Sequence, residues 1–469
     1  MSSLTLSIAS AAADAVQTLD PQLLYATLGA LAVLLGLILI FHIQAFLALL
    51  LASISLGLFS GMSLSDIAAS LDAGMGKTLA GIASVIGLGS IFGKILEDSG
   101  GAEALARALL RKFGIDRAPW ALMLAGFMIS IPVFFDVAVV LLMPILYVLH
   151  RDTKKSLLFF AFPLLAGLAV THAFVPPTPG PVAAAGILPA DIGLVVLWGV
   201  VIGLPCAIIG GPILGVWMSR RMQIGIPPYI QWDDTARVEA GLPSFWLVFG
   251  LIGLPLLLML GGSVVDLSVK KSLLPASQWT ALAAFLGRPL VALLLATLGA
   301  WYMLGIRRGF SLEKLQEIAG AALEPAGLII LVTGAGGVFK ELLVASGAGT
   351  ALAGVLQSWP VSPILLAWIL AAVVRALQGS ATVAMLTAAG FMAPVVERVG
   401  LSANLSAICV ISIASGATVL SHVNDSGFWM MSRYLGMSEK QMLRSWTILE
   451  TVIGVSGLLF CLLAAALVG

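Results

Sequence analysis

Ionisable and hydroxyl side chains interrupt long apolar stretches at four places in this sequence. Two are short breaks, one at Asp136 and one at 375–382, and two are the runs 171–181 and 421–427. A charged side chain at membrane depth costs roughly 2.5–3.5 kcal/mol or more, so such residues usually face a protein interior or a watery cavity. Arginine suits a carboxylate, and neutral polar groups suit hydroxyls. The four places together predict a polar site for an anion such as a carboxylate inside a membrane.

We predict that Arg375 and helix N-termini bind the carboxylate of this anion, because both carry positive charge. The side chains predicted to bind its other polar groups are Thr171, His172, Thr178, Ser380, Thr382, Asn424 and Ser426. A buried acid can take up and release a proton in the working pH range. The candidates for a coupled proton are therefore Asp136, Asp425 and His422.

Purely structural roles stay open for several of these residues. Arg375 could form an ion pair with Asp136 or Asp425 that only stabilises the fold. Asp136 could cap the helix that follows it, as aspartate often does at helix N-termini. A single interior histidine is commonly a hydrogen-bonded packing residue, which applies to His172 and His422.

Composition places these residues in a polytopic membrane protein. Hydrophobic residues make up 60% of the chain and charged residues 10%, against about 25% charged residues in a soluble domain. The net charge of +1 gives no sign of a nucleic-acid partner. The three cysteines lie in apolar stretches without a CxxC motif, so we expect neither metal sites nor disulfides. With no enzyme or nucleotide motif, we expect a transporter that uses an ion gradient, has no cofactor and is not an enzyme.

The apolar pattern predicts an all-α fold with about ten membrane-spanning helices and two hairpins. The expected spans are 23–41, 43–60, 77–97, 156–183, 193–218, 244–262, 289–305, 324–343, 402–430 and 446–468. The hairpins are expected at 119–149 and 361–396, with their breaks at Pro132 and at Gly379-Ser380. Both ends of the first hairpin are basic, which predicts that it enters and leaves on the cytoplasmic side. A segment of this kind is re-entrant.

Lysine and arginine are concentrated in the loops 107–117, 151–155, 220–237, 307–314 and 433–444. The positive-inside rule makes these loops cytoplasmic and puts both termini outside. The second hairpin then enters from the opposite face. We therefore predict two inverted repeats, 1–218 and 244–469, joined by a cytoplasmic linker at 219–243. A motif supports the repeat, because Gly87-x-Gly89-x-x-Phe92 recurs at a constant offset as Gly334-x-Gly336-x-x-Phe339.

At its four polar places the chain resembles the gluconate permease family of gluconate:proton symporters, within a larger ion-transporter superfamily. The motifs that carry the resemblance are Ile131-Pro-Val-Phe-Phe-Asp136-Val, His172 with Pro176-Pro177-x-Pro179-Gly180-Pro181, Gln378-Gly-Ser-Ala-Thr382-Val-Ala, and Ser421-His-Val-Asn-Asp425-Ser-Gly-Phe-Trp429. The resemblance implies a homodimer in the inner (plasma) membrane that moves its substrate by an elevator-like shift. Thr178 stands where the family pattern has histidine.

The resemblance implies proton-coupled uptake of gluconate or a related sugar acid as the function. Two alternatives in the same fold remain: a sodium-coupled carrier of di- or tricarboxylates, and a permease for glycerate or another hydroxy acid. The partners expected are thus the sugar acid, protons, the lipid bilayer and a second copy of the chain.

Overall fold

The fold is helical throughout the residues that the computed structural model describes, which are 21–228, 241–270, 272–349, 351 and 361–468. Within these residues, nine helical segments are long and apolar enough to cross a membrane. This confirms the expected all-α membrane fold. Residues 229–240 of the predicted linker at 219–243 lie outside the described residues, as does the N-terminal segment 1–20.

The first half of the chain begins with a helix pair and continues into a long helix. Its elements are α2 (Pro21–Leu39), α3 (Ala45–Phe59), α4 (Leu64–Asp98), α5 (Gly101–Phe113), α6 (Ala118–Ile129), α7 (Phe135–Thr153), α8 (Leu157–Phe174), α9 (Pro179–Ile187) and α10 (Ile192–Ile208). The last of these passes through the π-helical turn η1 (Ile209–Gly215) into α11 (Val216–Arg221).

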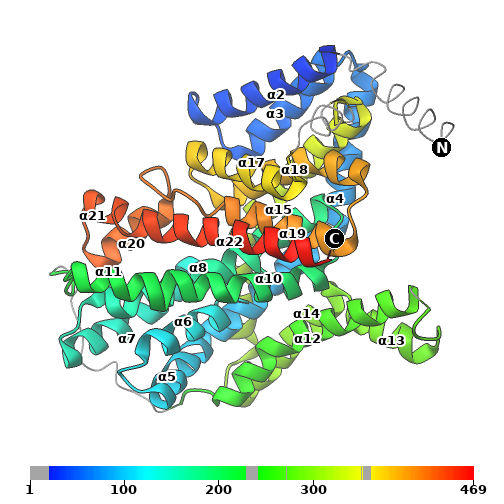
Figure 1. Ribbon diagram of the computed structural model, residues 1–469. Helices are drawn as coiled ribbons and strands as arrows, with labels where there is room; N and C mark the ends of the chain where they lie inside the picture. The colour runs from blue at the N-terminus through cyan, green and yellow to red at the C-terminus, as the bar shows by residue number, and fades with distance from the viewer. Residues whose placement is uncertain (1–20, 229–240, 271, 350, 352–360, 469) are drawn as a thin grey trace, which may run out of the picture.

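The second half contains the helices from Phe245 to Val468. Its elements are α12 (Phe245–Lys270), α13 (Gln278–Leu286), α14 (Pro289–Ala300), η3 (Trp301–Gly305), η4 (Ile306–Arg308), α15 (Leu312–Ala345), α17 (Pro363–Gln378), α18 (Ala381–Val399), α19 (Ala403–Gly416), α20 (Ser426–Leu435), α21 (Glu439–Leu443) and α22 (Trp446–Val468). In Figure 1, α2 and α3 lie on the side of the molecule opposite α12 and α14.

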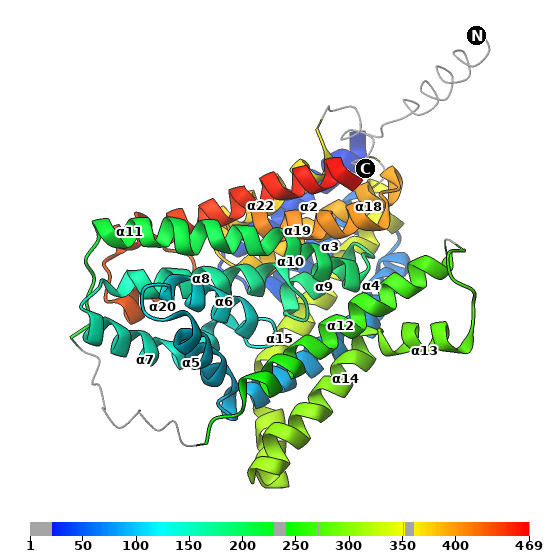
Figure 2. The same cartoon turned by 60° about the horizontal axis from the view of Figure 1, so that its bottom comes forward.

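Two helices are much longer than predicted, which corrects the expected spans 77–97 and 324–343. Helix α4 begins at Leu64 and α15 at Leu312, each after a serine N-cap whose side chain accepts a backbone N–H, Ser63 and Ser311. Hydrophobicity does not reveal these starts, since the first turns carry polar residues. Caps of this kind satisfy the free N–H groups of a helix start. The two helices pack along each other, and α4 also packs against α14 (Figure 2).

The repeated motif adopts the same local structure in both halves. Helix α4 ends at the C-cap Ser99 and α15 at the C-cap Ser346. The next residues, Gly100 and Gly347, both have a φ of 75°, in the left-handed region that glycine tolerates. The sequence repeat is therefore also a repeat of helix length and termination.

Two helix–turn–helix pairs occupy the positions of the predicted hairpins. Helices α6 and α7 are joined through Pro132, and α17 and α18 through Gly379 and Ser380. Both predicted breaks are confirmed. Helix α6 has 12 residues and so measures roughly 18 Å, which is less than the ~30 Å of a hydrocarbon core.

The predicted spans 156–183 and 402–430 are also broken helices. Helix α8 stops at Phe174 and α9 starts at Pro179, so the proline run ends one helix and opens the next. Helix α19 stops at Gly416, and α20 starts ten residues later at Ser426. Prolines remove helix hydrogen bonds and clash with the preceding turn, which explains the first break.

The core is built around α8, whose residues are almost all buried. It packs against α6 at two glycines: a Cβ on Gly126 would lie 2.3 Å from the Leu164 oxygen, and one on Gly167 2.2 Å from the Met123 oxygen. No larger residue fits at either position. Helix α10 runs beside α8 and α22, as Figures 1 and 2 both show. This close packing positions the pocket described next.

Candidate functional site

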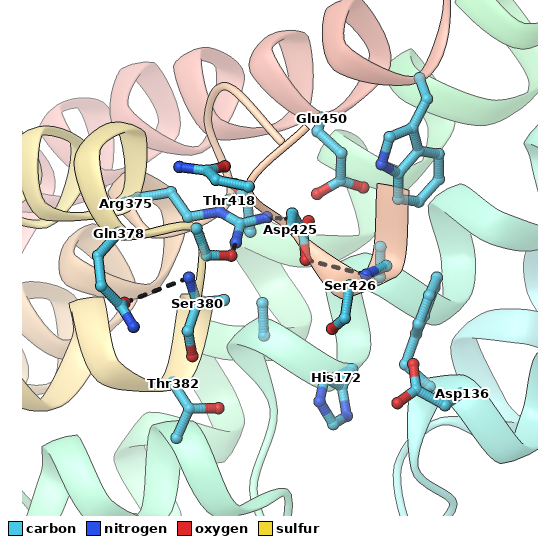
Figure 3. Close-up of a pocket in the computed structure, with 18 residues that line it drawn as sticks. Asp136, His172, Arg375, Gln378, Ser380, Thr382, Thr418, Asp425, Ser426 and Glu450 are labelled. Atoms are coloured by element: carbon cyan, nitrogen blue, oxygen red, sulfur yellow. Dashed lines mark hydrogen bonds and ion pairs between the residues drawn. The ribbon is translucent and has the colours of Figure 1, made fainter. Parts of the chain in front are cut away.

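A cavity of about 400 Å³ lies where the two helix–turn–helix pairs meet the broken helices. Its walls come from α7, α8, α17, α18, α22 and the loop that leads into α20 (Figure 3). Pockets for small ligands range over roughly 300–1,000 Å³. Most of the predicted site residues line it: Asp136, His172, Arg375, Ser380, Thr382, Asn424, Asp425 and Ser426. Segments that are far apart in the sequence are thus brought together as expected.

An ion pair between Arg375 and Asp425 forms one wall of the pocket. Arg375 Nη2 donates to Asp425 Oδ2 at 2.5 Å, and Nη1 donates to the carbonyl of Gly379. Arg375 is only 4% exposed. One of the two ion pairs considered from the sequence is therefore present, and it lies inside the cavity. Arg375 Nε has no hydrogen-bond partner among the described residues.

Asp425 is fixed by three donors at the start of α20. Besides Arg375, it accepts from Ser421 Oγ at 2.5 Å and from the backbone N–H of Gly427 at 3.0 Å, the latter as N-cap of the helix. Trp446 Nε1 donates in turn to Ser421 Oγ at 2.8 Å. Charged donors and a helix N-terminus both favour an ionised carboxylate. Asp425 is thus held as the counterion of Arg375.

Three helix N-termini open at the pocket. Residues of the first turns of α7, α18 and α20 line it, and Ser380 caps α18 by accepting the N–H of Val383 at 3.4 Å. A helix N-terminus attracts anions through its unpaired N–H groups and its dipole. Together with Arg375, these termini make the cavity suited to a carboxylate. Its hydroxyl and amide side chains suit a hydroxylated substrate.

The turn at Gly379 depends on the loop that precedes α20. Gly379 has a φ of 84°, and a Cβ there would lie 2.2 Å from the backbone carbonyl oxygen of Asn424. Asn424 Nδ2 donates to the carbonyls of Ala376 and Leu377, at 3.1 and 3.3 Å, and His422 Nε2 lies 2.9 Å from the Ala376 oxygen. These contacts hold the end of α17, and with it Arg375, against the loop.

Three predicted site residues do not line the cavity. Thr171 is buried without a partner for its hydroxyl among the described residues, Thr178 donates to the Val175 carbonyl at 2.7 Å, and His422 binds the end of α17. Asp136 does line it, at an exposed position. The N-cap of α7 is Phe134, and Asp136 makes no capping bond, so the proposed capping role for Asp136 is wrong.

Sequence reasoning missed five polar or aromatic residues of the lining: Phe135, Gln378, Thr418, Trp446 and Glu450. The sequence does indicate Glu450 as a candidate, because it is the sole charged residue of the apolar segment 446–468, and intramembrane acids are functional candidates. Gln378 lies in a motif already noted, and its Oε1 accepts the Ser380 N–H at 3.2 Å. Thr418 and Trp446 carry no such signal.

A family model described as "GntP family permease" matches residues 22–468. The gluconate permease of Pseudomonas aeruginosa is 40% identical over 445 residues, covering 94% of this chain and 97% of that protein. The low-affinity gluconate transporter of Escherichia coli K12 is 41% identical over 445 residues, covering 94% and 98%. These relatives are named as permeases or transporters, in agreement with the expectation that the chain is not an enzyme.

The fold is similar to that of a solved transporter. The crystal structure of the Alcanivorax borkumensis YdaH transporter aligns with a TM-score of 0.59 and 13% identity, covering 82% of this chain and 86% of that one. At this identity the similarity concerns the fold alone. The family match over nearly the whole chain and the relatives near 40% identity lead to the same conclusion: the chain belongs to the GntP permease family.

Proposed function

We propose that the protein takes up gluconate or a closely related sugar acid across the inner membrane, coupled to protons. The observation that carries this proposal is the cavity in which Arg375, three helix N-termini and several hydroxyl groups meet. The names of the relatives supply gluconate as the first substrate to test. A sugar acid needs one cationic contact and many hydrogen-bonding partners, and the pocket offers both.

The proton gradient supplies the energy in this proposal, and acids in the pocket carry the proton. Asp136, Asp425 and His422 are the candidates that the sequence predicts for that role. In the same proposal the two helix–turn–helix pairs are re-entrant and enter from opposite faces as parts of two inverted repeats. A homodimer with both termini outside would then move the pocket across the membrane in an elevator-like shift. The short α6 and the matching ends of α4 and α15 support these parts of the proposal.

Uptake of radiolabelled gluconate into proteoliposomes tests the function directly. With an acidic exterior we expect accumulation above the external concentration, in sodium-free buffer, because the proton gradient drives it. Unlabelled sugar acids should compete in the order of their fit to the pocket. Accumulation that requires sodium, or that succinate suppresses better than gluconate, would instead identify a sodium-coupled carrier of dicarboxylates.

A further inference from the structure

We infer that Glu450 is the residue that takes up the coupled proton when the substrate anion binds. This inference rests on the proposed function and names the group that performs the coupling. Glu450 lies one turn from the start of α22, lines the pocket and is 5% exposed. Figure 3 shows its carboxylate directed toward the Arg375–Asp425 pair.

Glu450 has no counterion of its own. Its Oε1 is buried without a hydrogen-bond partner in the described part of the chain, where no basic side chain forms an ion pair with it. Arg375, the cation that it faces, is already bound to Asp425 at 2.5 Å. A buried anion without a partner is costly, whereas a neutral acid at the same place costs much less. Glu450 is therefore the acid in the pocket whose charge is least stabilised.

The charges of the pocket link a proton to the substrate. In the empty pocket, Arg375 and Asp425 cancel, so apart from the exposed Asp136 an ionised Glu450 leaves one negative charge. A gluconate anion would add a second one a few side chains away, and like charges at such a site repel. If Glu450 binds one proton as the anion enters, the total charge is unchanged. On the other side of the membrane Glu450 returns the proton to water and the anion leaves.

The other titratable groups around Glu450 fit this role less well. Asp425 is fixed by three donors, and Asp136 lies at an exposed position of the lining. His172 lies among the rings of Phe134 and Phe135, at centroid distances of 6.3 and 6.4 Å. Of the helices packed against α22, α17 brings Arg375, α8 brings His172, and α10 and α19 bring the buried Cys206 and Cys409. Helix α21 brings Glu439 and Lys440, which are exposed. His422 is bound to the Ala376 carbonyl.

Proton uptake can be measured by titrating gluconate calorimetrically into the purified full-length protein, in two buffers of different ionisation enthalpy. At a pH at which Glu450 is ionised in the empty pocket, we expect about one proton per gluconate for the wild type and none for Glu450→Gln, because glutamine cannot be protonated. In proteoliposomes, a gradient of one pH unit should give roughly tenfold accumulation by the wild type. With Glu450→Gln the internal and external concentrations should become equal.

Glu450→Asp, which keeps the ionisable group, should retain proton uptake and accumulation. Glu317→Gln is the matched control at an exposed position on α15 and should behave as the wild type. If Glu450→Gln still takes up a proton with gluconate, or if His172→Asn alone abolishes that uptake, the inference is wrong. Loss of proton uptake in both Glu450 variants would assign a structural role and also overturn it. A wild type that binds no gluconate would instead refute the proposed function.

Discussion

Arg375 combines two roles that the sequence could not separate, since it holds the turn at Gly379 and also faces the cavity. Its two terminal nitrogens donate to two different acceptors, Asp425 and the Gly379 carbonyl. The planar guanidinium suits this forked geometry, and a lysine ammonium does not. An arginine that is neutralised in the empty pocket can still receive the substrate carboxylate, provided that the charge balance is restored elsewhere.

Arg375→Lys should weaken gluconate binding roughly tenfold to a hundredfold, since a hydrogen bond to a charged group contributes about 1.5–3 kcal/mol. Isothermal titration calorimetry of the purified variant measures this change. Arg444→Lys, at an exposed position after α21, is the matched control and should bind as the wild type does. Unchanged affinity in Arg375→Lys and also in Arg375→Ala would show that the carboxylate binds elsewhere.

The contribution of a pocket hydroxyl group to gluconate binding can be tested with two threonines of α18. Thr382→Val keeps the shape of the side chain in the lining and removes one hydrogen-bonding group. We expect a loss of affinity of roughly 2- to 10-fold, equivalent to about 0.5–1.5 kcal/mol. Thr387→Val, buried on the same α18 but outside the lining, should leave the affinity as it is. Equal effects of the two substitutions on binding would contradict a direct contact through Thr382.

At the scale of elements, the turn between α17 and α18 is the part most sensitive to its neighbours. Gly379 combines a left-handed backbone with a contact that leaves no room for a side chain. Its counterpart at the end of α18, Gly400, has a φ of 67° and open space around it. A side chain at Gly400 therefore tests backbone strain alone, whereas a side chain at Gly379 tests backbone strain together with steric exclusion.

Gly400→Ala should cost about 1–2 kcal/mol, the usual penalty of a left-handed conformation. Gly379→Ala should cost more, because the new methyl group would displace Asn424 and with it the anchoring of Arg375. Thermal unfolding in detergent measures the stability, and gluconate binding should fall only in Gly379→Ala. Similar binding by the two variants would mean that the turn does not need its contact with the loop.

The sequence anticipated the interruptions of the helices better than their ends. Pro132, Gly379 and the proline run are local signals, and each of the breaks is found at its predicted place. The starts of α4 and α15 differ from the predicted spans because their first turns carry polar residues, which lie outside the apolar stretch that predicts a span. Thr418 and Trp446 reach the pocket through tertiary packing, which sequence periodicity does not describe. Glu450 could have been recognised from its charge alone.

At the scale of the whole molecule, the orientation of the two helix–turn–helix pairs decides the proposed architecture. Asp116 and Asp152 lie at exposed positions at the two ends of the first pair, and Ser362 and Ala403 at those of the second. The native cysteines are buried, so introduced cysteines can be labelled selectively from either side.

In oriented membranes we expect a membrane-impermeant maleimide to label Asp116→Cys and Asp152→Cys from the cytoplasmic side only. The substitutions Ser362→Cys and Ala403→Cys should react only from the outside, because the second pair is inverted relative to the first. Labelling of the two ends of one pair from opposite faces would make that pair an ordinary crossing, and the inverted arrangement would fail.

The contact between α6 and α8 limits how this molecule can rearrange. With Gly126 and Gly167 pressed against the opposing backbone, neither helix can slide past the other without a collision of main-chain atoms. Because α7 follows α6 after a short turn and also packs against α8, the first turn of α7 and the last turn of α8 must move together, carrying Asp136 and His172 as one rigid block. Any sliding surface must lie farther out, where side chains rather than backbones meet.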